Sequence, residues 1–192
     1  MRSITKEEIA TFDTEEFNGR IFVIDTPDET ERAVNYLSEF DNLGFDTETR
    51  PSFKKGNLNN VALIQLATSN RCYLFRLNRI GFSAPLIQLL SDENIHKIGL
   101  SLKDDFSTMN RGMQFSPQGF IDLQKIVTNH NIADLSLQKI YAILFQKKIS
   151  KSQRLSNWEA DELSNAQKKY AALDAWACLK IYTKLCHTNA FT

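Results

Sequence analysis

The sequence predicts an α/β fold in which a mixed sheet is flanked by helices on both faces. Two apolar runs, 61–68 and 72–77, are rich in β-branched and aromatic residues and flank a short Ser-Asn-Arg segment. Together with the run 43–49 before them, they favour an antiparallel meander. Beyond the meander, expected strands alternate with expected helices, which is typical of a mixed sheet with helices packed against it. We expect five or six strands.

The individual elements follow from local signals. The run 21–25 (IFVID) favours the first strand. Thr26 and Glu29 then form a capping box, and Pro27 takes the first helical position, so a helix should run to about Phe40. The other elements are assigned from apolar runs, turn residues and caps. We expect strands at 43–49, 61–68, 72–77, 95–100 and 119–123, and helices at 84–90, around 104–110 with an end at Gly112, at 122–130 and at 136–145.

The final helix has the clearest signals in the chain. Ser164 and Gln167 form a capping box of the S-x-x-Q type. Apolar residues then recur at helical spacing as far as Leu185. Tyr170 and Asp174 are four residues apart, so they lie on one face of this helix. A phenol and a carboxylate beside an apolar stripe indicate a functional surface.

Length and composition indicate one domain, residues 1–192, with a proper hydrophobic core. The chain has 192 residues, of which 42% are hydrophobic. No apolar run approaches the ~20 residues that span a membrane, and the N-terminus has no apolar segment of a secretory signal. The three cysteines form no CxxC pair. We therefore expect a reducing, cytoplasmic setting with buried thiols.

The formal net charge is zero, but the charge is unevenly distributed. Acidic residues dominate 1–48, whereas basic residues outnumber acidic ones in 49–192. Ordinary surface variation and a basic face for a polyanion both explain this pattern. The absence of a large basic excess argues against tight, purely electrostatic binding of nucleic acid.

Two carboxylates lie on the strand expected at 43–49. Asp46 and Glu48 are two residues apart, so their side chains point to the same face and can converge on one cation, with Thr47 facing away. The alternative for Asp46 is a strand-end aspartate that caps a neighbouring helix. A second D-x-E, Asp13–Glu15, follows no strand, and we expect it in a solvated helix or turn.

Two further acids, Asp105 and Asp174, lie in separate blocks of the chain. Simpler alternatives exist for each, because Asp105 can favour a helix N-terminus and Asp174 can be an exposed partner of lysine. The joint occurrence of four acids and Tyr170 favours a single site.

Clustered, buried carboxylates need a compensating cation, and hard oxygen ligands without Cys or His select Mg²⁺ or Mn²⁺. Two ions about 3.5–4 Å apart can clamp the attacking and leaving oxygens of phosphodiester hydrolysis, while Tyr170, helped by Glu48, orients the water.

These motifs, in this order, resemble the DEDD (DnaQ-like) superfamily of 3′→5′ exonucleases, in its tyrosine branch. The motifs are D-x-E at Asp46 and Glu48, a lone aspartate at Asp105, and Y-x-x-x-D at Tyr170 and Asp174. The histidine branch uses H-x-x-x-x-D, but a lysine stands five residues before Asp174. The segments VALIQLATSNRCYLF and RLSNWEADELSNAQKKYAALDAWACLKIY are similar to the group that contains the Werner syndrome helicase exonuclease domain and ribonuclease D. The resemblance covers roughly residues 20–187.

The resemblance implies a ribonuclease H-like fold and metal-dependent 3′→5′ hydrolysis of DNA or RNA, which releases nucleoside 5′-monophosphates. It also implies that Asp46, Glu48, Asp105 and Asp174 hold two divalent ions and that Tyr170 orients the water. The alternative is a catalytically silent module of the same fold that binds nucleic acid or protein, although no acid of the motifs is missing. No helicase or HRDC domain follows, so we expect a stand-alone exonuclease domain or one targeted by a protein partner such as a helicase.

Substrate contacts are expected at two places, although no motif distinguishes DNA from RNA. Thr47 and Thr49 flank Glu48 and can bind the terminal nucleotide. The basic segment 145–154 can follow a phosphate backbone, although a solvated loop explains it equally well. We expect Trp158 in the core rather than as a base-stacking platform. The basic residues of this segment are Lys147, Lys148, Lys151 and Arg154.

Overall fold

The computed structural model describes residues 1–51, 59–112 and 116–189, and its centre is a mixed sheet of six strands. The spatial order of the strands is β1-β4-β3-β2-β5-β6. Strands β2, β3 and β4 form the antiparallel meander, whereas β1, β5 and β6 pair in parallel with their neighbours. The predicted mixed sheet is therefore confirmed. The strands are β1 (Arg20–Ile24), β2 (Asn42–Thr49), β3 (Val61–Ala67), β4 (Arg71–Arg76), β5 (His96–Gly99) and β6 (Phe120–Asp122).

The long helices begin where their caps predict. The Thr26 hydroxyl and the Glu29 side chain form the capping box of α2, and Ser164 and Gln167 exchange hydrogen bonds at the start of α8. The short helices α1 and α3 were not predicted, and α2 ends at Leu37 rather than near Phe40. The helices are α1 (Lys6–Ala10), α2 (Pro27–Leu37), α3 (Leu77–Ile80), α4 (Ala84–Leu90), α5 (Leu102–Gly112), α6 (Leu123–Val127), α7 (Leu137–Phe145) and α8 (Asn165–Asn189), with a 3₁₀ turn at Thr128–His130.

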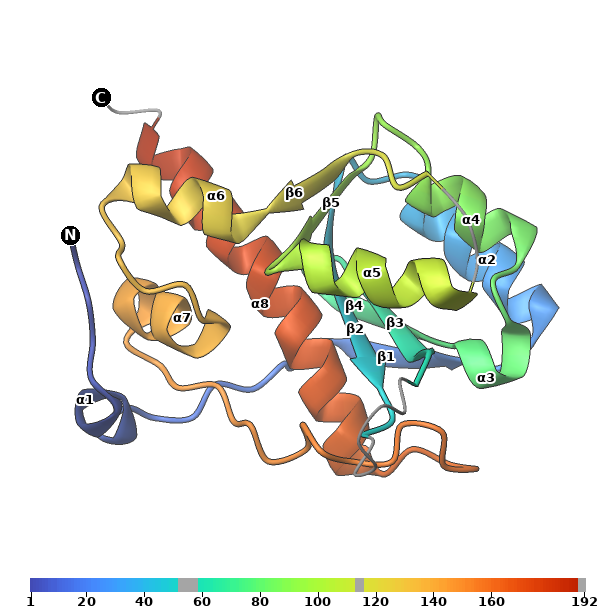
Figure 1. Cartoon of the computed structure of the whole chain (residues 1–192), viewed down its shortest axis with the longest axis horizontal. Coiled ribbons are helices and arrows are strands. Elements are labelled where there is room, and N and C mark those ends of the chain that lie inside the picture. The colour runs from blue at the N-terminus through green and yellow to red at the C-terminus, as the bar shows by residue number, and fades with distance from the viewer. Residues whose placement is uncertain (52–58, 113–115, 190–192) are drawn as a thin grey trace.

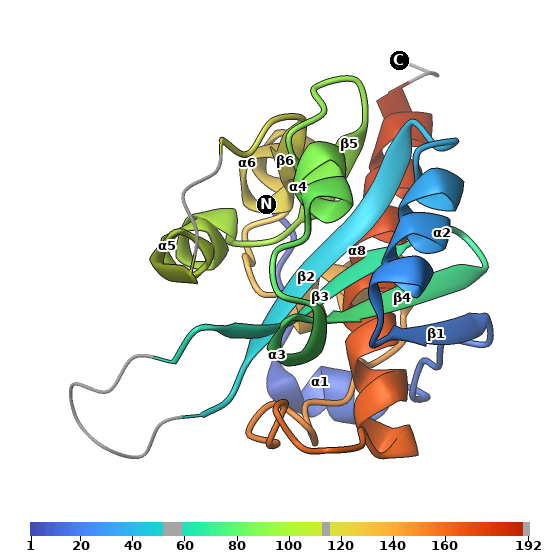
Figure 2. The ribbon, with the colours of Figure 1, turned by 90° about the vertical axis from the view of Figure 1, so that its right-hand side faces the viewer.

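Helices cover both faces of the sheet, as predicted. Helix α8 runs diagonally across one face (Figure 1) and contacts β2, β3, β4 and β5. Helices α6 and α7 lie on the same side and share its apolar core. Helices α2 and α4 pack together against the opposite face (Figure 2), and the start of α5 joins this second core. Two apolar layers therefore enclose the sheet.

Helix α8 comes closest to the sheet at β2. A Cβ atom added to Gly44 would overlap the carbonyl group of Ala175. Glycine at this position therefore lets the helix backbone approach the strand directly. The close approach brings Asp174, the residue before Ala175, over the strand that holds Asp46.

The expectation that Asp13–Glu15 forms a solvated helix or turn is wrong. Thr14 instead makes a parallel bridge with Lys148. The half-buried Glu15 carboxylate accepts hydrogen bonds from the Tyr141 hydroxyl at 2.6 Å and from Lys180 Nζ at 3.0 Å. Both partners lie more than a hundred residues away, so no local pattern revealed them.

Several single-residue expectations can also be compared with the structure. Trp158 is fully buried, as predicted. Cys72 and Cys178 are buried, but Cys186 is exposed, so the expectation of buried thiols is wrong at that position. Among the helices of the described ranges, none combines the length and hydrophobicity needed to cross a bilayer.

Candidate active site

Strand β2 presents two carboxylates to helix α8. Asp46 and Glu48 alternate with Phe45 and Thr47, so the acids and their neighbours point to opposite faces. Phe45 is fully buried in the core under α2 and α4. The register of β2 against β3 shifts between Glu48 and Thr49, which marks the end of regular pairing just after the second acid.

Helix α8 supplies the facing side chains. Asp174 is only 7% exposed, and Tyr170 lies one turn before it on the same face. Each of Asp46, Glu48 and Asp174 offers a carboxylate oxygen, and these three oxygens lie within 4.8 Å of one another. The predicted convergence of the first and third motifs is therefore present in the fold.

The chemistry of this cluster fits a divalent cation. All three groups are hard oxygen donors, which suit Mg²⁺ or Mn²⁺ better than softer metals. Burial raises the pKa of Asp46 well above its usual range, and the negative charges of Asp174, Glu48 and Asp105 raise it further. A cation would relieve both effects by neutralising the cluster.

The pKa values of the other two carboxyl groups, Glu48 and Asp174, are also raised. Burial, followed by repulsion from Asp174 and Asp105, raises the pKa of Glu48 to about 9. Burial also raises the pKa of Asp174 to about 7, although a hydrogen bond from Tyr170 and the charge of Lys151 oppose the rise. Without a cation, Glu48 therefore holds its proton at neutral pH, and cation binding must release protons.

Asp105 lies beside this cluster rather than within it. Its carboxylate accepts a hydrogen bond of 2.5 Å from the Thr47 hydroxyl, which is the side chain that points away from the two acids of β2. Burial raises the pKa of Asp105 to about 6, although the Thr47 hydrogen bond opposes the rise. Its charge still raises the pKa of both Asp46 and Glu48, so Asp105 belongs to the same electrostatic group.

The helix that holds Asp105 is fixed by a carboxylate from the next strand. Asp122, at the end of β6, accepts hydrogen bonds from the backbone N–H of Ser101 at 3.1 Å and of Leu102 at 3.2 Å. Ser101 has a φ of 62°, a left-handed conformation that non-glycine residues rarely adopt. The tight turn between β5 and α5 thereby sets where α5 begins and where Asp105 lies.

Tyr170 stands next to the acids as a neutral phenol. Burial raises its pKa above the ordinary value of 10.0, and the charges of Asp174 and Glu48 raise it further. Its hydroxyl forms a hydrogen bond with Asp174. A phenol with a raised pKa does not act as a base near neutral pH, but it can donate and accept hydrogen bonds.

An open cleft of about 590 Å³ lies over the acids. The exposed residues Lys151 and Arg154 line it. Their charges act on the cluster, because Lys151 lowers the pKa of Asp174 and Arg154 lowers that of Glu48. The cleft therefore combines buried carboxyl groups at its base with positive charge at its rim.

The other two lysines of the basic segment have different surroundings. Lys147 forms an ion pair with Asp13 at 3.2 Å, and Lys148 Nζ donates to the carbonyl oxygen of Ala10 at 3.1 Å. Neither lysine lines the cleft over the acids. The N-terminal segment thus binds the first half of the basic segment and leaves the second half beside the acids.

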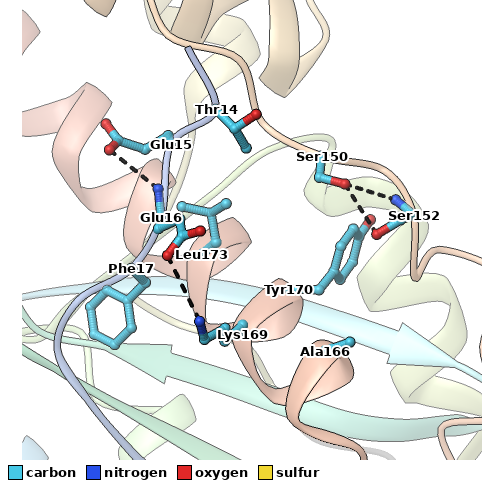
Figure 3. A pocket seen from close by; sticks show the side chains of 10 residues that line it. All are labelled: Thr14, Glu15, Glu16, Phe17, Ser150, Ser152, Ala166, Lys169, Tyr170 and Leu173. Atoms are coloured by element: carbon cyan, nitrogen blue, oxygen red, sulfur yellow. Dashed lines mark hydrogen bonds and ion pairs between the residues drawn. The ribbon is translucent and has the colours of Figure 1, made fainter.

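The N-terminal segment also reaches the back of Tyr170. Residues 14–17 and the hydroxyls of Ser150 and Ser152 border a pocket of about 190 Å³ that Tyr170 shares with the main cleft (Figure 3). Two of its lining residues, Glu16 and Lys169, form an ion pair at 3.7 Å (Figure 3). The N-terminal residues therefore support the wall behind the phenol.

Part of the cleft lining was not anticipated from the sequence. Its lining also includes Leu100, Gln124 and residues 135–137 at the start of α7, and Cys178 lies one turn beyond Asp174. No local motif marks these positions, because long-range packing of α6 and α7 beside α8 brings them to the cleft. Among the other predicted positions, Thr49 lies at the end of β2 and pairs with Val61.

The fold and the acid site together define the class of 3′-5′ exonuclease domains. The family model described as 3′-5′ exonuclease matches residues 21–188, so the chain belongs to this family and the predicted family is confirmed. The mouse bifunctional 3′-5′ exonuclease/ATP-dependent helicase WRN is 36% identical over 155 residues, which cover 78% of this chain and 11% of that protein. A 3′-5′ exonuclease of Arabidopsis thaliana is 30% identical over 185 residues, which cover 88% of this chain and 64% of that protein.

A solved structure gives the same result for the fold. Escherichia coli RNase D, an exoribonuclease involved in structured RNA processing, superposes with a TM-score of 0.78 at 24% identity, over 90% of this chain and 46% of that chain. The predicted ribonuclease H-like fold is confirmed by this likeness. The chain spans less than two thirds of each of these relatives, since it covers 11% of the mouse protein and 64% of the Arabidopsis protein.

Proposed function

We propose that this chain is a metal-dependent 3′→5′ exonuclease that removes nucleotides from the 3′ end of DNA or RNA as nucleoside 5′-monophosphates. The main support is the convergence of Asp46, Glu48 and Asp174 within 4.8 Å, beside Tyr170, in a chain that belongs to the 3′-5′ exonuclease family. A cleft with basic residues at its rim provides room for a strand end.

Asp46, Glu48 and Asp174 would hold the cations, with Asp105 completing the group from α5. Two ions, Mg²⁺ or Mn²⁺, supply positive charge that lowers the pKa of the attacking water and stabilises the departing 3′-oxygen. The carboxylates must lose their protons to take this role, which ties activity to pH through the raised pKa values of Glu48 and Asp174.

Tyr170 and the basic rim would act on the water and the substrate. The phenol, held by Asp174, orients the water for in-line attack on the last phosphodiester. The bond from phosphorus to water oxygen forms as the bond to the 3′-oxygen breaks, and that oxygen takes up a proton to become the new 3′ end. Lys151 and Arg154 bind phosphates of the strand as it enters the cleft.

The decisive experiment compares two 5′-labelled single strands of one sequence, one DNA and one RNA. Each is incubated with the protein in Mg²⁺, Mn²⁺ or EDTA, beside the variants Asp46→Ala and Asp41→Ala. Asp41 is an exposed acid that precedes β2 and is the matched control. We expect a ladder that shortens from the 3′ end, requires the cation, and disappears only with Asp46→Ala.

Three results would contradict the proposal. A cation-independent ladder would point to other chemistry. Retention of full activity by a folded Asp46→Ala variant would exclude the acid cluster as the site. Binding of the strands without shortening, in every condition and on duplex substrates as well, would instead indicate a silent binding module of the same fold.

A further inference from the structure

The side chain of Gln65, in the middle of β3, is a buried polar group without a protein partner. Gln65 is 0% exposed. Within the described ranges, neither its amide nitrogen Nε2 nor its oxygen Oε1 forms a hydrogen bond. A buried amide without partners typically destabilises a fold by about 1–3 kcal/mol, so its presence calls for a specific reason.

The strand register places Gln65 directly beside the acid cluster. Gln65 pairs with Asp46 across β2 and β3, and with Leu74 across β3 and β4. Residues directly opposite in an antiparallel pair share a face, with Cβ atoms about 4.5–5.5 Å apart. Gln65 and Asp46 therefore both point toward α8 from directly opposite positions on β3 and β2.

The remaining neighbours of Gln65 on this face are mostly apolar. Leu63 and Ala67 flank it on its own strand, and Leu74 lies on the far side, all in the core under α8. The diagonal residue Arg76 is polar. Its Nη groups donate to the carbonyl oxygens of residues 160 and 161 and pair with Asp25, and its Nε, a donor, has no partner among the described residues. Charged oxygen atoms therefore lie on the side of Gln65 that faces β2 and the acid cluster.

We propose that Gln65 is a positioning residue for Asp46, and this inference rests on the metal site of the proposed function. Its Nε2 group donates a hydrogen bond that fixes the Asp46 carboxylate when the cluster binds cations. Carboxylates that hold metals are themselves usually hydrogen-bonded by such outer partners. An amide suits this place because it donates a hydrogen bond without adding charge to a cluster whose pKa values are already raised by repulsion.

The test compares Gln65→Met with Leu74→Met, a control at the same depth on the other side of the amide. Both replacements are close in volume to the residues they replace. Mn²⁺ binding is measured by calorimetry on the protein without nucleic acid. We expect Gln65→Met to weaken Mn²⁺ binding by about 10–100-fold, and Leu74→Met to leave it unchanged. In EDTA, the melting temperature of Gln65→Met should stay the same or rise, because an unpaired amide is removed.

Equal Mn²⁺ affinity in Gln65→Met and the parent protein would overturn the inference while leaving the exonuclease proposal intact. No Mn²⁺ binding by the parent protein would overturn both. Kinetics gives a separate measurement: Gln65→Met should need a higher Mn²⁺ concentration for half-maximal activity, with KM for the oligonucleotide unchanged. If the amide were purely structural, its replacement would lower the melting temperature and would not change the Mn²⁺ concentration needed for half-maximal activity.

A second measurement covers the case in which Gln65→Met does not fold. In ¹⁵N-labelled parent protein, the side-chain amide signals of Gln65 should shift on addition of Mg²⁺, and their exchange with water should slow. The amide of Gln88, exposed on α4, is the internal control and should not respond. Signals of Gln65 that remain unchanged at saturating Mg²⁺ would overturn the inference.

Discussion

Replacement of Asp174 by asparagine should stabilise the cation-free protein at alkaline pH. Burial raises the pKa of Asp174 from 3.8 to about 7. The folded state therefore binds more protons than the unfolded state between these pH values, and the free energy of unfolding falls as pH rises. This decrease in the free energy of unfolding begins near pH 4 and is complete above pH 7. One pKa unit corresponds to about 1.4 kcal/mol, so Asp174 destabilises the fold by up to roughly 4 kcal/mol at pH 8. This figure is an upper limit, because neighbouring carboxyl groups take up protons in its place.

The assay is thermal unfolding of the parent protein and Asp174→Asn at pH 5 and pH 8, in EDTA and in Mg²⁺. For a chain of this length, 1 kcal/mol shifts the melting temperature by about 2–4 °C. In EDTA at pH 8 we therefore expect the variant to melt up to about 8–16 °C higher, with less than half of this gain at pH 5. Mg²⁺ should stabilise the parent protein by mass action and the variant far less.

Two results would refute this reasoning. A variant that melts at or below the parent temperature in EDTA at pH 8 would mean that the ionised carboxylate does not destabilise the cation-free cluster. Equal stabilisation of both proteins by Mg²⁺ would mean that Asp174 does not contribute to cation binding. Asparagine keeps a carbonyl oxygen for the Tyr170 hydroxyl, so a lost hydrogen bond would not explain either result.

Three further predictions concern the surroundings of the cluster. Tyr170→Phe should lower kcat by about 100-fold while Mn²⁺ affinity, measured by calorimetry, stays within twofold; a matching loss of affinity would contradict a role in orienting water. Lys151→Ala and Arg154→Ala should each reduce the slope of log Kd against log salt for a single strand by about 0.7, whereas Lys147→Ala, which loses only the pair with Asp13, should not. Gly44→Ala should destabilise the fold by about 1–3 kcal/mol or more in urea unfolding, because the new Cβ overlaps α8; wild-type stability would contradict the close approach.

Features that depend on nearby residues could be predicted from the sequence. The Thr26 and Ser164 capping boxes start α2 and α8 as expected, because their hydrogen bonds join residues only three apart. Strand alternation predicted that Asp46 and Glu48 face one way and Thr47 the other. These features could be predicted because helix and strand periodicities are properties of the local backbone.

Features that depend on contacts between distant segments could not be predicted. The hydrogen bond from the Thr47 hydroxyl to Asp105 joins residues 58 positions apart, and no local pattern predicted it. The basic segment was treated as one unit, yet the N-terminal segment binds Lys147 and Lys148 from more than a hundred residues away. Spacing in the sequence carries no information on which of several lysines meets a distant acid, since that depends on how the packed elements meet.

The order of the elements along the chain affects when a working site can exist. Strand β2 and helix α5 are synthesised before α8, which supplies Asp174 and Tyr170 and is the last helix of the described residues. Until α8 packs on Gly44, the acids of β2 have no facing partner, and the apolar surface of the sheet stays uncovered. Because chains fold from the N-terminus as they emerge from the ribosome, the cluster of Asp46, Glu48 and Asp174 assembles only after α8 has been synthesised.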